Sequence, residues 1–414
     1  MTYTDKNYEP DPRNDYVFEF QIRPLNMSLE AAGERILEYT SMRDWDLANK
    51  DFPKESVKIK PKLCDVDSNS SLIWLAYPRE IFEDNNPSVL ISLYHYISSL
   101  GFLRSVRLTD LHIPQRSKSR FYGPRYGLSG VDKRFARKGP FISVVLERSF
   151  AMTPSSQAKF AYELWNAGVD IVREDYTFTD SATNDFFERT ERTMAMLGRI
   201  EKETGKRRAF IPNIASEPTE MVRRADHLKA LGCETASVDV ASCGISAIGS
   251  LRKHSYLFII GNTPFSQMEM HDSDNGISPL AASKISALSG IDSLYLGRVV
   301  FSDIVAGHRN TRFHLDQDSA IDIVSSIRSE GPLKPLVPMI SGGMHPADIS
   351  SAISLFGKDV MLDFDECCYD HPDGPISGAK ALDQARQAIE SGVPLERFSK
   401  GRRELDKSLN RWSV

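Results

Sequence analysis

The sequence lacks the features of membrane, secreted and nucleic-acid-binding proteins. It holds no run of 18 apolar residues, so no transmembrane helix is predicted. Residues 1–6 have no apolar core of the kind that a signal peptide needs. The 51 basic residues are outnumbered by 56 acidic ones, giving a net charge of −5. This balance makes no electrostatic case for nucleic acid or an anionic membrane as a partner, and we expect a cytoplasmic protein.

Cysteine and histidine also lack a metal-binding or disulfide pattern. The five cysteines are odd in number and scattered, which is typical of reduced thiols rather than of a disulfide framework. Cys367 and Cys368 are adjacent, which is the wrong spacing for a zinc knuckle. The nine histidines show no paired ligand spacing. The sequence therefore predicts no metal site built from these residues.

The chain is long enough for two domains. Its 414 residues exceed the usual size of one core. With 41% hydrophobic and 26% charged residues, its composition is that of an ordinary globular protein.

Residues 1–14 are polar and are predicted to form a flexible arm, and residues 15–138 a first domain. Ser28 is a plausible N-cap for a helix that begins at Leu29. Strands and helices alternate through this part of the chain, which predicts an α+β domain. A loop over residues 113–140, rich in proline, glycine and arginine, is expected to link it to a second domain at 139–414 with a charged helical tail.

From Phe141 onward short apolar runs alternate regularly with longer helical stretches. Such a rhythm predicts a (β/α)8 TIM barrel of class α/β, with an open doubly wound sheet as the alternative. The eight predicted strands are residues 142–146, 169–172, 209–211, 236–240, 256–260, 293–296, 337–340 and 360–364.

Polar and charged residues follow these runs. The carboxyl ends of barrel strands face the active site, so we expect these side chains to gather around one cavity that takes a small-molecule substrate. The candidates are Glu147, Arg148, Arg173, Glu174, Asp175, Asn213, Asn262, Arg298, Ser341, Gly342, Gly343, Asp365 and Glu366.

The candidates divide by chemistry. Ser341-Gly342-Gly343 precedes a predicted helix, where backbone N–H groups can approach an anion. The three arginines can bind a carboxylate or phosphate, or pair with neighbouring carboxylates as structural ion pairs. Glu147, Glu174 and Asp175 are candidates for a proton-transfer base.

Several segments resemble the RuBisCO large-chain superfamily. Residues 167–176 resemble its metal-site segment Gly-Gly-Leu-Asp-Phe-x-Lys-Asp-Asp-Glu, and residues 107–114, 121–130, 341–345 and 371–379 resemble other motifs in the family's order. The resemblance is to a divergent RuBisCO-like protein. It implies a ferredoxin-like N-terminal domain, a C-terminal barrel and a homodimer.

The chain departs from the family's motifs at the site. Arg173 stands where the family has the lysine that becomes a magnesium-binding carbamate, and an arginine cannot form that group. Glu147 replaces a catalytic lysine, and Tyr176 replaces a metal-binding glutamate. Asp365 and Glu366 replace the glycines that cradle a phosphate. We therefore expect no bound metal and no other cofactor.

These departures lead to the expectation of a protein that is not a carboxylase. It would be a metal-independent lyase or isomerase that transfers a proton next to a carbonyl on a small, non-bisphosphate metabolite. Glu147 or Glu174 would be the base, and Arg173 would stabilise the enolate. The alternatives are a non-catalytic binding or scaffold protein, and a family enzyme that retains magnesium-dependent enolase chemistry.

Overall fold

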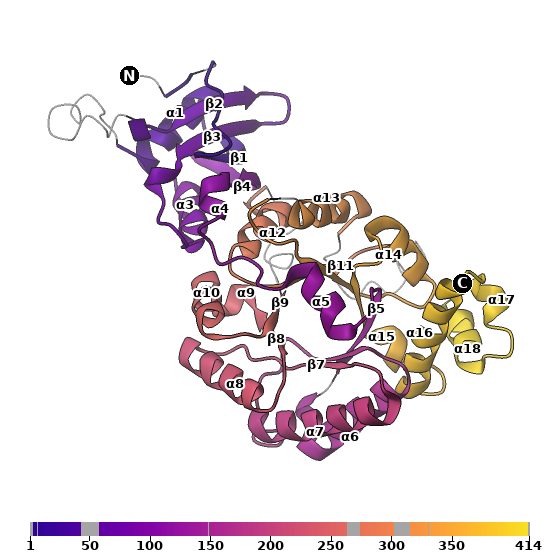
Figure 1. The fold of residues 1–414 in the computed structure, drawn as a ribbon. Coiled ribbons are helices and arrows are strands. Elements are labelled where there is room, and N and C mark those ends of the chain that lie inside the picture. The colour runs from indigo at the N-terminus through magenta and orange to yellow at the C-terminus, as the bar shows by residue number, and fades with distance from the viewer. Residues whose placement is uncertain are drawn as a thin grey trace. The chain divides into compact units, whose positions relative to one another are not determined.

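The computed structural model describes residues 3–5, 7–42, 58–147, 149–262, 274–301, 315–329 and 331–412. The chain forms two compact units. The first comprises Met1–Gly123, Phe265–Ser289 and Ser329–Leu333, and the second Pro124–Pro264, Gly290–Arg328 and Lys334–Val414. Figure 1 shows the elements of both units along the chain. None of the helices within the described ranges is long and apolar enough to cross a membrane.

The first unit is a five-stranded sheet with helices, as predicted. Its strand order is β10-β4-β1-β3-β2, with β1 antiparallel to both β3 and β4. Every second residue of β1 is apolar and buried, from Tyr16 to Ile22. Ser28 caps the following helix, since its side chain accepts a hydrogen bond from the Ala31 N–H. The elements are β1 (Asp15–Pro24), α1 (Leu29–Thr40), β2 (Lys62–Asp67), β3 (Leu72–Pro78), α3 (Ser88–Ser98), β4 (Leu103–His112), α4 (Gln115–Lys118), β10 (Gly276–Ile277) and α12 (Pro279–Ala287).

Two features of this unit were not expected. Strand β2 has no apolar alternation in its sequence, so periodicity does not reveal it. The N-terminal residues expected as a flexible arm are bonded to the sheet: Thr4 pairs with Leu63, and the Tyr8 hydroxyl donates to Asp15 at 2.5 Å.

The second unit is a closed parallel barrel, which confirms the (β/α)8 prediction. Its strand order is β7-β6-β5-β13-β12-β11-β9-β8. The ring closes because Asn213, after β7, bridges to Ser237 of β8, so the open doubly wound alternative is wrong. The strands are β5 (Phe141–Leu146), β6 (Ile171–Glu174), β7 (Ala209–Ile211), β8 (Thr235–Asp239), β9 (Phe258–Asn262), β11 (Ser293–Arg298), β12 (Val337–Ser341) and β13 (Met361–Phe364).

The helices of this unit include one that the sequence analysis placed in a loop. Helix α5 packs Val131 and Phe135 against the first residues of several strands, among them Phe141 and Ile171. It therefore closes the amino end of the barrel (Figure 1). The helices are α5 (Gly127–Phe135), α6 (Pro154–Asn166), α7 (Phe186–Thr204), α8 (Pro218–Ala230), α9 (Val240–Cys243), α10 (Ile245–His254), α13 (Gln317–Arg328), α14 (Asp348–Phe356), α15 (Glu366–Tyr369), α16 (Pro375–Glu390), α17 (Leu395–Phe398) and α18 (Arg403–Trp412).

Strand β6 begins at Ile171, two residues later than predicted. Asp170 precedes this strand. Its carboxylate accepts a hydrogen bond from the Ile142 N–H at 2.9 Å and forms ion pairs with arginine side chains. As a result Arg173 and Glu174 lie within the strand and not beyond its end. Successive strand residues point to opposite faces, so one side chain enters the barrel and the other leaves it.

Asp292 holds the amino end of the barrel together. It is fully buried, pairs with Arg252, and accepts the N–H groups of Tyr126 and Ile259. We predict that Asp292→Ala lowers the free energy of unfolding by about 3–5 kcal/mol, because it leaves a buried guanidinium unpaired. Urea denaturation measures this change.

Glu188→Ala is the control for Asp292→Ala. Glu188 is half exposed and forms a surface ion pair with Arg192 on α7. Its loss should cost less than about 1 kcal/mol. Equal effects of the two variants would contradict the role given to Asp292.

Candidate functional site

A buried ion pair lies inside the barrel at the centre of the predicted site. The Arg173 guanidinium of β6 donates to Asp363 of β13, with Nη2 2.7 Å and Nε 3.2 Å from Oδ2. The side chains are 3% and 1% exposed. The Ser143 hydroxyl also donates to Asp363, at 2.6 Å, and Arg173 Nη1 donates to the Glu174 carbonyl. This network joins β5, β6 and β13 across the barrel interior.

The charge of Arg173 is fixed by this partner. Burial by itself lowers the pKa of Arg173, but the negative charge of Asp363 and its hydrogen bonds raise the pKa above its usual value. The guanidinium also lies 5.4 Å from the ring centroid of Tyr295 on β11. Burial raises the pKa of Tyr295, which keeps this phenol neutral beside the charge. The barrel interior thus holds a permanent cation whose nearest neighbour is an anion.

Glu174 lies on the other face of β6, outside the barrel. It is fully buried and pairs with Arg189 of α7 at 2.7 Å. Its carboxylate also accepts from the Gln157 side chain at 2.8 Å and from the Asn213 N–H at 3.0 Å. A carboxylate with these partners fixes α6, α7 and the end of β7. The geometry gives Glu174 a structural role rather than access to a substrate.

Asp175 and Asn213 shape the loop that follows β6. Asp175 is half exposed, and its side chain accepts from the N–H and hydroxyl of Thr177. The Asn213 amide donates to the carbonyls of Asp175, Tyr176 and Phe178. Asn213 is therefore fully used in holding this loop, which leaves the Asp175 carboxylate as the more accessible of the two.

Three predicted binding residues form a turn at the end of β12. Gly342 and Gly343 have φ values of +96° and +73°, which a residue with a side chain adopts only with strain. A Cβ on Gly342 would also collide with Arg298, which pairs with Ser341 across β11 and β12. The turn and Arg298 therefore lie side by side at the ends of β11 and β12, with the Arg298 Cα, Cβ and Cγ atoms against Gly342.

Asn262 ends strand β9 in the same ring of strand ends. It is 2% exposed, and neither atom of its amide group has a hydrogen-bond partner among the described residues. An unsatisfied buried amide costs about 1–3 kcal/mol, so it is a candidate for contact with a bound molecule.

The mouth also carries Glu147, Asp365 and Glu366. Glu147 follows β5, is half buried, and donates its N–H to the Tyr369 hydroxyl at 2.9 Å. Asp365 caps α15, and burial together with the charge of Asp363 raises the pKa of Asp365 to about 6. A carboxyl group with this pKa can exchange a proton near neutral pH. Arg148, the remaining candidate, lies outside the described residues.

Magnesium, which the family resemblance implies, does not fit the groups at the family's metal segment. Arg173 is a charged guanidinium that cannot become a carbamate. Glu174 is committed to Arg189, and Tyr176 offers no carboxylate. No group of three or more His, Cys, Asp or Glu side chains within the described ranges is arranged to hold a metal ion. The side chains of Arg173, Glu174 and Tyr176 therefore do not form a magnesium site.

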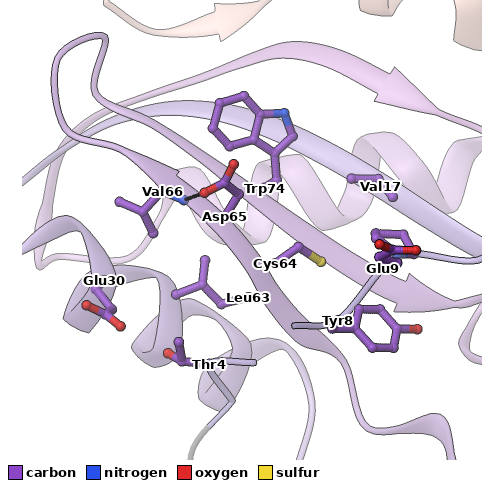
Figure 2. A pocket seen from close by; sticks show the side chains of 11 residues that line it. Thr4, Tyr8, Glu9, Val17, Glu30, Leu63, Cys64, Asp65, Val66 and Trp74 are labelled. Carbon is purple, nitrogen blue, oxygen red and sulfur yellow. Dashed lines mark hydrogen bonds between the residues drawn. The ribbon is translucent and has the colours of Figure 1, made fainter. Parts of the chain in front are cut away.

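The first unit has a pocket of its own, of about 540 Å³ (Figure 2). Three carboxylates line it, from Glu9, Glu30 and Asp65, together with the rings of Tyr8 and Trp74. Figure 2 shows the Asp65 carboxylate bonded to the Val66 N–H. An acidic lining repels phosphate and carboxylate groups, which favours the barrel mouth for an anionic substrate.

Sequence reasoning missed Asp363 and Arg189. These residues form the ion pairs that determine the roles of Arg173 and Glu174. Both carried a signal. Asp363 is a charged residue inside the apolar run 360–364, and a buried charge requires a partner. Arg189 lies three residues after Phe186 and eight before Leu197, a spacing that puts it on the apolar face of a helix, where a guanidinium must also be paired.

We predict that Asp363→Ala lowers the free energy of unfolding by about 3–5 kcal/mol, because it leaves the buried charge of Arg173 without an ion-pair partner. Asp175→Ala, in the half-exposed loop, is the matched control and should cost about 1 kcal/mol. Chemical denaturation of both variants measures the difference. A loss below about 1 kcal/mol in Asp363→Ala would show that Arg173 does not depend on this partner.

We predict that the Asp365 carboxyl has a pKa of about 6, above the ordinary value for an aspartate. Because the folded state then binds a proton that the unfolded chain has released, stability falls as pH rises from about 4 to 6. Carbon-13 NMR measures the titration directly. Unfolding of Asp365→Asn should lack this part of the pH dependence, and an Asp365 pKa near 4 would contradict the prediction.

Comparison with known proteins places this site in a family. Residues 2–117 match the model of the ribulose bisphosphate carboxylase large chain, N-terminal domain. Residues 131–412 match that of the large chain, catalytic domain. A ribulose bisphosphate carboxylase of Methanocaldococcus jannaschii is 31% identical over 428 residues, covering 100% of both chains. One of Methanosarcina barkeri is 30% identical over 425 residues, covering 99% of this chain and 98% of the relative.

Solved structures agree with the sequence matches. Octameric Rubisco from Pyrococcus horikoshii superposes with a TM-score of 0.89 at 28% identity, covering 99% of this chain and 97% of the other. Dimeric archaeal Rubisco from Hyperthermus butylicus gives 0.89 at 25% identity, covering 99% and 98%. A rubisco-like protein from Burkholderia fungorum shares the fold, with a TM-score of 0.78 at 21% identity over 96% of this chain and 98% of the other.

These comparisons contradict the expectation of a protein that is not a carboxylase and works as a metal-independent lyase or isomerase, or as a binding protein. The relatives named carboxylases match both units from end to end at about 30% identity. That expectation was drawn from the side chains at a few strand ends, whereas the similarity extends along 99% or more of the chain. With the two domain models, the closed barrel and the glycine turn at its mouth in agreement, the chain belongs to the ribulose bisphosphate carboxylase large-chain family.

Proposed function

We propose that this chain is an enzyme that carboxylates ribulose bisphosphate at the carboxyl-terminal mouth of its barrel. The single observation that carries this is the match over 100% of both chains to a protein named ribulose bisphosphate carboxylase. A barrel enzyme works at the carboxyl ends of its strands, and Asn262, the Gly342-Gly343 turn and Asp365 lie at such ends.

The mouth offers groups suited to an anionic sugar. The turn of Gly342 and Gly343 presents backbone N–H groups beside Arg298, a combination that binds phosphate. The unsatisfied amide of Asn262 can donate to and accept from a hydroxyl group. We assign the phosphate to the turn and a sugar hydroxyl to Asn262.

Carboxylation of ribulose bisphosphate requires a proton to leave the carbon beside the carbonyl, which gives an enediolate. The former carbonyl carbon of this enediolate then forms the new bond to carbon dioxide. Asp365, with a pKa of about 6, and Glu147 are the groups at the mouth that we assign to this transfer. The Arg173 guanidinium contributes a fixed positive charge inside the barrel, largely balanced by Asp363. Arg173 replaces the lysine of the family's motif. A carboxylation assay therefore also tests whether the reaction can proceed with an arginine at this position.

We also propose that the chain assembles as a homo-oligomer, with a homodimer as its basic unit. The solved relatives are described as dimeric and octameric. Light scattering on the purified chain distinguishes these states.

We predict that the purified chain incorporates label from carbon-14 bicarbonate into an acid-stable product only when ribulose bisphosphate is added. The assay is run with and without added magnesium and against a heat-inactivated sample. Incorporation no greater than in the inactivated sample under every condition would overturn the proposed activity.

Gly342→Ala should raise the KM for ribulose bisphosphate by about tenfold or more, because the new methyl group displaces Arg298 and the turn. Gly357→Ala is the matched control. Gly357 also has a positive φ, of +76°, but an added Cβ meets nothing within 4 Å. An unchanged KM in Gly342→Ala would remove the turn from substrate binding.

A further inference from the structure

A second cavity lies in the barrel unit, away from the residues assigned to carboxylation. It has a volume of about 600 Å³, which is in the range of small-molecule sites. Residues of α5, α8 and α10 line it together with the segments that lead into β7, β8 and β9. Arg207 precedes β7, Glu234 precedes β8, and Phe258 begins β9. The cavity is therefore at the amino end of the barrel, opposite the mouth.

The cavity is basic although the chain as a whole is acidic. Its lining holds the cationic side chains of Lys133, Arg134, Arg207 and Lys229 and the acidic side chains of Asp226 and Glu234. Arg134 pairs with Glu234, and Arg207 pairs with Glu201. Within the described part of the chain, Lys133 and Lys229 have no ion pair. Two exposed ammonium groups are thus available to an anion.

The same cavity has an aromatic rim and an apolar floor. Tyr256 is 66% exposed, which is unusual for so large a ring. Its centroid lies 4.7 Å from the Arg125 guanidinium carbon and 5.5 Å from Lys229 Nζ. Leu257 and Phe258 also line the cavity, and both side chains are buried. In addition, Arg134 Nε is buried and has no hydrogen-bond partner among the described residues.

We propose that this cavity binds a nucleoside phosphate. A base would stack against Tyr256 over the apolar floor, since aromatic stacking tolerates any base. The phosphates would be held by Lys133 and Lys229 as point charges, and the buried Arg134 Nε offers a further donor. A simple anion would contact only the two lysines. A nucleoside phosphate would also contact the exposed Tyr256 ring and the apolar side chains of Leu257 and Phe258, so it fits the cavity better.

The test is isothermal titration of the full chain with ATP and, separately, with inorganic phosphate. We expect saturable binding of one ATP per chain, with phosphate binding more weakly. The double variant Lys133→Ala/Lys229→Ala should weaken ATP binding by about tenfold or more. Tyr256→Ala should weaken ATP binding without changing phosphate binding, because only the nucleoside uses the ring.

Lys253→Ala is the matched control, since Lys253 is exposed on α10, one of the helices that border the cavity, but does not itself line the cavity. It should bind ATP as the unaltered chain does. Absence of saturable ATP binding, unchanged binding in the double variant, or phosphate binding as tight as ATP would each overturn the proposal.

Competition with ribulose bisphosphate distinguishes this site from the barrel mouth. Ribulose bisphosphate should not displace ATP. Displacement would place the nucleotide at the mouth and overturn the assignment. The carboxylation assay has its own readout, so failure of ATP binding leaves the proposed reaction untouched, and failure of carboxylation leaves this site untouched.

Discussion

The barrel interior is organised around one buried ion pair, between Arg173 and Asp363. Two charges removed from water are stable only when the remaining hydrogen-bonding groups are also satisfied. Here Ser143 and the Glu174 carbonyl complete the network, so β5, β6 and β13 must keep their register for the pair to exist. Burial raises the pKa values of Tyr295 and Asp365 at the mouth, and the charges of this pair act on both groups as well: Asp363 raises these pKa values and Arg173 lowers them.

The two ends of the barrel bury different polar groups. At the amino end Asp170 is paired with Arg137, Arg208 and Arg386, and Asp292 is paired with Arg252. At the carboxyl end the Asn262 amide has no partner among the described residues, and the pKa of Asp365 is raised. The amino end also holds buried donors without a hydrogen-bond partner among the described residues, at Nε of Arg134, Arg208 and Arg386, so both ends retain unmet hydrogen-bonding capacity.

Much of the fold could be predicted from the sequence, because the alternation of short apolar runs and helices is a local signal. The Ser28 cap and the glycine turn at 341–343 are also local and were found where expected. What failed depends on distant partners. Asp363 is 190 residues from Arg173, and no spacing rule links them. Arg173 and Glu174 were expected beyond a strand end, but they lie within β6 and point to opposite faces.

The functional interpretation failed for a related reason. Single replacements such as Glu147 and Arg173 were read as loss of the family's reaction, although the effect of a side chain depends on the partners that the fold gives it. Glu174 shows the same limit: it has the chemistry of a base, but its pairing with Arg189 makes it part of the scaffold. Which residues surround a position is decided by the closed barrel and cannot be inferred from one strand.

A crystal structure of the chain with ribulose bisphosphate tests the central claim most directly. The account predicts the sugar phosphate at the barrel mouth, with a phosphate on the N–H groups of Gly342 and Gly343 and the Arg173–Asp363 pair intact. A ligand bound elsewhere, or an Arg173 side chain turned away from Asp363 to make room for it, would contradict the account.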